Sequence, residues 1–125
     1  MKQIVLVAAG GAIGSVLRYQ AGIVALRLFG THFPWGTLFV NVTGSLMIGI
    51  FVEVIARAFD ASMDVRVFLV TGVLGGYTTF SAFALDAVAL SERGELATAF
   101  AYVAASVTVS IAAVFAGLAL ARAIL

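Results

Sequence analysis

The stretch Gly75–Phe83, GGYTTFSAF, lies near the middle of an apolar run from Val65 to Leu90 that is long enough to cross a lipid bilayer. Paired glycines beside hydroxyl side chains are poor formers of a continuous helix, and here they lie at the depth where water is scarcest. Non-helical backbone at membrane depth is tolerated only where it is buried in protein or lines a cavity. We therefore expect the helix to break at this stretch, and the break to serve a function.

The composition of the chain is that of an integral membrane protein. Of its 125 residues, 63% are hydrophobic and 10% are charged, against roughly half and a quarter in soluble domains. One membrane-crossing helix takes about 20 apolar residues, and four segments meet that length, at about 3–28, 35–58, 65–90 and 96–125. We predict an all-α protein of the cell membrane (plasma or inner), with one four-helix transmembrane domain over 1–125 and a broken third helix.

The same composition argues against several classes of function. The chain has no cysteine and a single histidine, His32, so neither a thiolate site nor a histidine metal cluster is expected. The net charge of +1 includes no basic tract that would attract nucleic acid. No pair of nucleophile and base and no phosphate-binding loop indicates an enzyme.

The charges that flank the four segments are nearly balanced. With four helices both chain ends lie on one side, and Lys and Arg in the flanks set the orientation. The side of the termini carries Lys2, Arg57, Arg66 and Arg122, whereas the other side carries Arg27 and Arg93. So small a difference favours insertion in both directions, which would permit an antiparallel homodimer. A single orientation is the alternative that the count leaves open.

Polar residues recur at every fourth position on two of the segments, so that each forms one face of a helix. Such faces either line a polar path through the membrane or hydrogen-bond within and between helices. Two regular stripes favour the path, and Asn41 is its sharpest member because an amide is costly in hydrocarbon and offers two donors to an anion. The stripes are Thr37, Asn41, Ser45, Gly49 and Glu53, and Thr98, Tyr102, Ser106 and Ser110.

Three further features indicate where helices pack and where ions bind. Gly10 and Gly14 have the spacing that lets helix backbones approach closely. Arg18 lies roughly 15 Å from the far end of its segment, so it either lines an aqueous vestibule that draws in anions or pairs with a carboxylate of another helix. Phe80 and Phe83 share a helical face, and their ring edges can approach an anion, although packing is the usual role of such rings.

Three stretches carry a resemblance to a known family: GGAIGSVLRY, PWGTLFVNVTGS and GGYTTFSAF, which occur in this order along the chain. On them the chain resembles the Fluc family of fluoride channels, the CrcB-type proteins. The resemblance implies a four-helix subunit in an antiparallel, dual-topology homodimer with two fluoride pores, which lets fluoride leave the cytoplasm passively. It also implies a central Na⁺ held by the backbone carbonyls of Gly75 and Thr78 from both subunits.

The resemblance further assigns roles to single residues. It implies a vestibule arginine at Arg18 and a fluoride pore lined by Asn41, Phe80, Ser81, Phe83, Tyr102, Ser106 and Ser110. Members of the family commonly read TTFSTF where this chain reads TTFSAF, so Ala82 stands in place of a hydroxyl residue.

Two other classes of membrane protein compete with this prediction. A small dual-topology multidrug exporter would match the size of the chain, but it needs a carboxylate embedded in its first helix, and residues 3–28 contain none. A membrane subunit that only packs against partners would not need two polar stripes and a broken helix. The expected partners are therefore fluoride, a second copy of the chain and the lipid bilayer.

Overall fold

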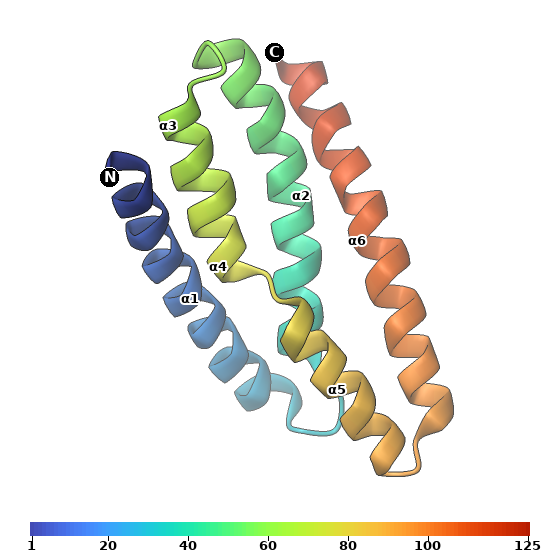
Figure 1. Ribbon diagram of the computed structural model, residues 1–125. Coiled ribbons are helices and arrows are strands. Elements are labelled where there is room, and N and C mark those ends of the chain that lie inside the picture. Colours follow the sequence, from blue (N-terminus) through green and yellow to red (C-terminus); the bar gives the residue numbers. More distant parts are fainter.

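The computed structural model describes all residues, 1–125, and consists entirely of helices and short connections. Four stretches of helix are long and apolar enough to cross a membrane, which confirms the prediction of four spans. Three of them are unbroken, and the third is divided into several helical segments (Figure 1). The elements are α1 (Lys2–Phe29), α2 (Trp35–Ala58), α3 (Met63–Arg66), η1 (Val67–Leu74), α4 (Gly75–Tyr77), α5 (Phe80–Glu92) and α6 (Leu96–Ile124).

The third span is interrupted at Thr78 and Thr79, which follow the paired glycines. Both threonines have extended backbone, with φ −89° and ψ 159° at Thr78 and φ −154° and ψ 122° at Thr79. The π-helical segment η1 leads into this region. Gly75 and Gly76 themselves remain helical, in α4. The expected break is therefore present, but the threonines rather than the glycines leave the helix.

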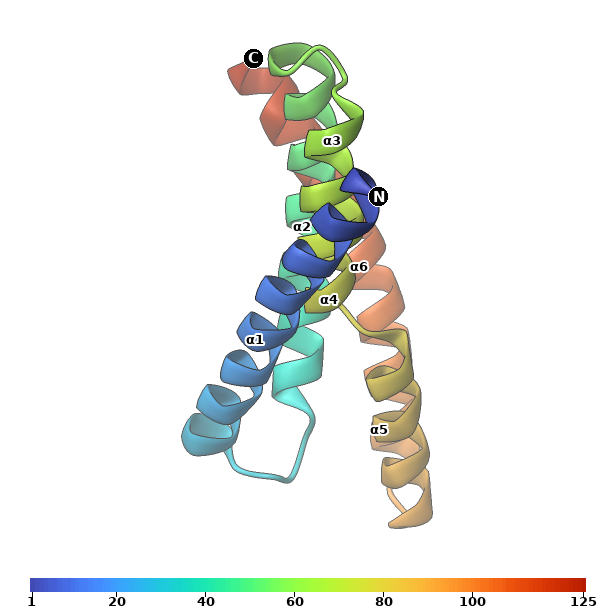
Figure 2. The same ribbon diagram turned by 60° about the vertical axis from the view of Figure 1, so that its left-hand side comes forward.

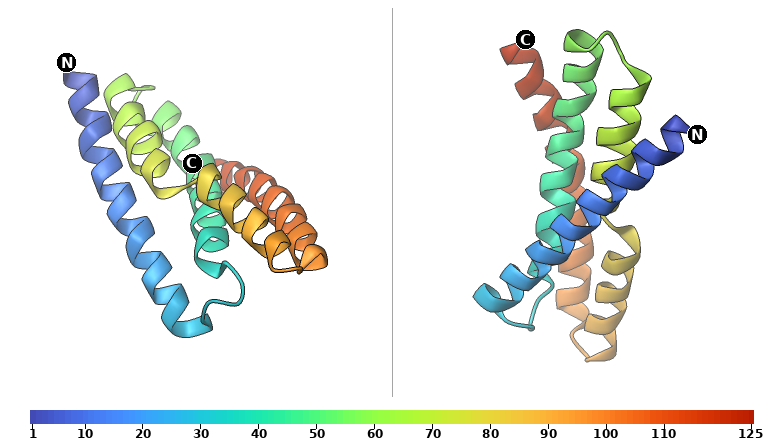
Figure 3. Two further views of the ribbon diagram at one scale, coloured as in Figure 1. Left: turned by 60° about the horizontal axis from the view of Figure 1, so that its bottom comes forward. Right: turned by 90° about the vertical axis from the view of Figure 1, so that its left-hand side faces the viewer.

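The two halves of the third span pack against different helices. The half before the break, η1 and α4, lies along α1, whereas α5 lies along α6. Figure 2 shows α5 and α1 diverging below the break, and Figure 3 shows α1 crossing the other helices at an angle. Both termini lie toward the end of the molecule that carries the α2–α3 loop, as expected for four crossings (Figure 1).

Glycines allow close approach at two helix interfaces. Gly10 and Gly14 are the buried residues of α1, and a Cβ added at Gly10 would lie 2.5 Å from the Phe68 carbonyl oxygen in η1. On the other side of the molecule Gly49 of α2 meets Gly117 of α6, where a Cβ on either would overlap backbone of the facing helix. The packing role expected of Gly10 and Gly14 is confirmed, and Gly49, read as part of a polar stripe, also serves packing.

We expect Gly117→Ala to destabilise the fold, because the added methyl group would overlap the Leu46 carbonyl oxygen. Overpacking of this kind costs about 1–3 kcal/mol, which exceeds the gain of about 1 kcal/mol from replacing glycine by alanine in a helix. Thermal unfolding of the purified protein in detergent measures the effect. Gly22→Ala is the matched control, since a Cβ there meets nothing within 4 Å; equal melting temperatures for the two variants would contradict the close contact.

Candidate functional site

The break is held by the side chain of Asn41 in α2. Its Nδ2 donates to the Thr79 carbonyl oxygen at 2.9 Å, and its Oδ1 accepts from the Thr79 amide at 2.8 Å. The side-chain amide thus takes the place of a neighbouring peptide group on both sides of one residue. One of the two Nδ2 hydrogens remains for another acceptor, so the two donors expected for an anion are reduced to one.

This pairing changes the hydrogen bonding of the backbone around the break. In a continuous helix the Thr79 amide would donate to the Gly75 carbonyl oxygen. Here it donates to Asn41 Oδ1 instead. The Thr78 amide and hydroxyl both donate to the Leu74 carbonyl oxygen at 2.9 Å, while the Thr78 carbonyl accepts no hydrogen bond within the chain. The break therefore presents carbonyl oxygens, which are the ligand type that hard cations prefer.

A cavity of about 410 Å³ lies against the break and collects most of the predicted site residues. It is bounded by α2, the third span and α6, and both predicted carbonyl residues contribute to its wall. The structure thus brings polar groups from three helices to one place at the depth of the break. The predicted site residues that line it are Asn41, Gly75, Thr78, Phe80, Phe83, Ser106 and Ser110.

The two phenylalanines beyond the break are neighbours with very different surroundings. Their ring centroids lie 5.5 Å apart at an interplanar angle of 59°. Phe83 is buried and packs on Tyr102 at 5.2 Å, whereas Phe80 is 79% exposed. Phe83 is therefore fixed within the chain, and Phe80 stands free on its surface.

Ser106 is the most unusual polar group of the cavity wall. It is buried, and its Oγ has no hydrogen-bond partner in the chain. Buried hydroxyl groups are nearly always hydrogen-bonded, so an orphaned one points to a partner that the chain alone does not supply. A hydroxyl can donate to an anion or exchange bonds with water.

Two predicted pore residues lie outside this cavity. Tyr102 is fully buried one turn before Ser106, and its hydroxyl donates to Asp86 Oδ2 at 3.2 Å. Ser81 is exposed and lies beside Thr79, with 3.3 Å between the two hydroxyl oxygens. The Asp86 contact was not foreseen, because its two partners belong to segments whose relative register the sequence does not give.

Arg18 lies at a second and larger cavity of about 640 Å³, between α1, the α1–α2 loop and α5. Its Nε donates to the Gly76 carbonyl oxygen at 3.0 Å. Within the chain no carboxylate forms an ion pair with it, so the alternative of a carboxylate partner gains no support. Ala82 and Asp86 line the same cavity as Arg18. A hydroxyl side chain in place of Ala82 would therefore lie at this larger cavity and not at the cavity of Ser106.

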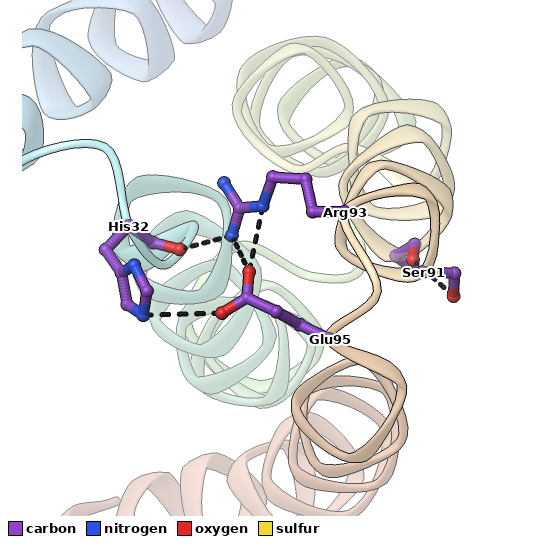
Figure 4. A network of polar contacts seen from close by, with 5 residues as sticks. His32, Ser91, Arg93 and Glu95 are labelled. Atoms are coloured by element: carbon purple, nitrogen blue, oxygen red, sulfur yellow. Dashed lines mark hydrogen bonds and ion pairs between the residues drawn. The ribbon is translucent and has the colours of Figure 1, made fainter.

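Polar networks tie the helix ends together at both ends of the molecule. At one end Arg93 bonds the His32 carbonyl oxygen at 2.8 Å and pairs with Glu95, which also lies 3.5 Å from the His32 ring (Figure 4). At the other end Glu53 pairs with Arg57 and Arg122. Exposed pairs of this kind contribute little to stability. They fix the α1–α2 loop to the α5–α6 turn and α2 to α6.

We expect Asn41→Leu to loosen the break, because it leaves the Thr79 amide and carbonyl without partners. Each buried group left unpaired costs about 1–3 kcal/mol. Hydrogen exchange of the Thr79 amide, followed with the melting temperature, measures the effect. Ser45→Ala, one turn further on the same face of α2, is the control; if exchange at Thr79 stayed as slow in Asn41→Leu as in the control, the clamp would be refuted.

Comparisons with known proteins place the chain among close relatives. Residues 5–118 match the family described as "CrcB-like protein, Camphor Resistance (CrcB)". A protein of Rhizobium johnstonii named "Fluoride-specific ion channel FluC" is 63% identical over 124 residues, which cover 99% of each chain. A protein of Agrobacterium fabrum with the same name is 62% identical over 122 residues, which cover 98% of each chain. A protein of Nitrobacter hamburgensis named "Fluoride-specific ion channel FluC 1" is 54% identical over 119 residues, which cover 95% of this chain and 94% of the relative.

Proposed function

This chain belongs to the CrcB-like family, and from that membership we propose that it is a fluoride-selective ion channel. The relatives named fluoride-specific ion channel match this chain over nearly their whole length. The chain is a multi-pass membrane protein of a channel family rather than an enzyme. Membership also removes the support for the rival multidrug exporter, whose coupling carboxylate is absent from Lys2–Phe29.

The observation that carries the proposal is the orphaned hydroxyl of Ser106 beside the rings of Phe80 and Phe83. Fluoride holds its water tightly, so a narrow membrane path admits it only if donors replace the lost water at close range. Ser106, Ser110 and the remaining hydrogen of Asn41 Nδ2 are such donors. The positive edges of the two phenyl rings would cover the distance between them without binding the ion too strongly.

The finer assignment of the pore follows the same chemistry. We propose that Ser81 and Tyr102 extend the path beyond the cavity, and that Arg18 draws anions into the larger cavity that it lines. Flow would be passive, so fluoride would leave the cytoplasm whenever its concentration there is higher. Chloride is larger and less suited to short hydrogen bonds, which makes it the anion to exclude.

The working unit in this proposal is an antiparallel homodimer with two pores. Only 15 of 125 residues are buried within one chain, and the Phe80 ring beside the cavity is left uncovered. The near-balanced flanking charges would let both orientations insert. A second copy in the opposite orientation would cover the cavity and, by symmetry, complete one pore on each side of the interface.

A structural Na⁺ at the break fits the residues present. The Thr78 carbonyl has no donor, the Gly75 carbonyl has lost its helical one, and no group of three or more acidic or histidine side chains competes as a metal site. Uncharged oxygens suit a hard monovalent ion. Gly75 and Thr78 of both copies would hold it at the dimer axis, where it would supply positive charge near the pores.

We expect liposomes that contain the protein to release fluoride and retain chloride. Phe80→Ile and Phe83→Ile keep an apolar side chain but remove the ring edge. Each should reduce fluoride efflux at least about tenfold, which corresponds to a loss of about 1.4 kcal/mol. An ion-selective electrode measures the efflux. Phe115→Ile is the control, because this ring of α6 is also exposed but lies away from the cavity. Full flux in both pore variants would remove the phenylalanines from the path.

The antiparallel arrangement predicts labelling from both sides of the membrane. The chain has no cysteine, so Gln3→Cys, near the N-terminus, and Glu92→Cys, at the opposite end of the molecule, each supply one thiol. In intact cells a membrane-impermeant maleimide should label part of each population, and the remainder should react only after permeabilisation. If Gln3→Cys reacted from one side alone and Glu92→Cys only from the other, the chain would have a single orientation.

A further inference from the structure

The face of α1 that packs on the third span ends in a charged residue at the break. Gly10, Gly14 and Arg18 follow one another at intervals of four, so they lie on one side of the helix. A Cβ at Gly14 would overlap the Val73 carbonyl and lie 2.8 Å from the Tyr77 amide. One turn further, the Arg18 guanidinium reaches the Gly76 carbonyl oxygen at 3.0 Å. The small residues thus bring α1 close enough for Arg18 to bond the last turn before the break.

That last turn is a helix end with more carbonyls than donors. The final four carbonyls of a helix have no donor within it, and the end carries partial negative charge. Here the Leu74 carbonyl accepts from Thr78 and the Gly76 carbonyl accepts from Arg18. The Gly75 carbonyl, between them, is one of the two oxygens proposed for the cation.

The contact between Gly76 and α1 is close. A Cβ at Gly76 would lie 2.6 Å from the Gly11 carbonyl oxygen and 3.1 Å from the Ser15 hydroxyl oxygen. The peptide at Gly76 is therefore confined by α1 and bonded by Arg18, while Asn41 holds Thr79 from the other side of the break. Gly75 and Thr78 lie next to these two held residues.

We propose that Arg18 is a positioning residue for the cation site: its bond to the Gly76 carbonyl fixes the last turn of α4 and with it the direction of the neighbouring carbonyls. This inference rests on the sodium site of the proposed function, and it gives Arg18 a task separate from attracting anions. The two tasks predict opposite signs. A positive charge near a cation weakens cation binding by repulsion, so if Arg18 acted only through its charge, removing it would strengthen sodium binding.

The test is the sodium dependence of the melting temperature of the purified dimer, with N-methyl-D-glucamine chloride replacing sodium chloride at constant ionic strength. A cation that binds the folded state alone raises the melting temperature with its concentration. For Arg18→Met we expect the sodium concentration that gives half of this rise to increase at least tenfold. Arg18→Lys, which keeps the charge and an ammonium group that can donate, should fall between Arg18→Met and the wild type.

Arg27→Met is the control, since Arg27 lies on the same helix and makes no hydrogen bond or ion pair. Melting curves lowered equally at all sodium concentrations would assign Arg18 a general packing role and overturn the inference, as would an unchanged or lowered half-maximal concentration. If Arg18→Met does not fold, Arg18→Gln is judged by the same criterion. If the melting temperature of the wild type did not depend on sodium, the proposed cation site would be refuted, and the role of Arg18 with it. Fluoride efflux, measured in parallel, would then still test the proposed channel function by itself.

Discussion

The two hydrogen bonds between the Asn41 amide and the Thr79 backbone are the interaction on which the rest of the structure depends. In hydrocarbon an unpaired peptide group costs about 2–7 kcal/mol, depending on the reference state. A span that leaves the helix at mid-depth must therefore find donors and acceptors elsewhere. An asparagine side chain offers one of each in the geometry of a peptide group, so a single residue of α2 meets the need on both sides of Thr79.

The change of direction at Thr78 and Thr79 creates the site. Before the break the third span packs on α1, and after it on α6, so α5 leaves α1 and opens the space that both cavities occupy. At the same depth the chain presents an acceptor without a donor, the Thr78 carbonyl, and a hydroxyl without a partner, Ser106 Oγ. Thr78 and Ser106 thus line one cavity, where a carbonyl oxygen without a donor and a hydroxyl without a partner are available together.

Much of the fold could be predicted from the sequence, because four apolar segments and a polar interruption are local signals. The position of the break within GGYTTFSAF could not, since Gly76 is needed for contact with α1 and Thr79 for capping, where its hydroxyl accepts from the Ala82 amide at 3.1 Å. The bond from Asn41 to Thr79 joins residues 38 apart. No periodicity reveals such a pair, nor those of Arg18 with Gly76 and Tyr102 with Asp86. The polar stripe on α2 did not predict the packing role of Gly49, because the spacing of the polar residues coincides there with that of a packing contact.

The length of the two halves has a consequence for how the chain enters the bilayer. Met63–Tyr77 and Phe80–Glu92 are each about 20 Å long at 1.5 Å per residue, whereas the hydrocarbon layer is about 30 Å thick. Neither half can cross alone, so the insertion machinery must recognise them together as one hydrophobic unit. The two halves therefore enter the membrane as one span. Within that span the Asn41 amide of α2 replaces the hydrogen bonds that the break removes.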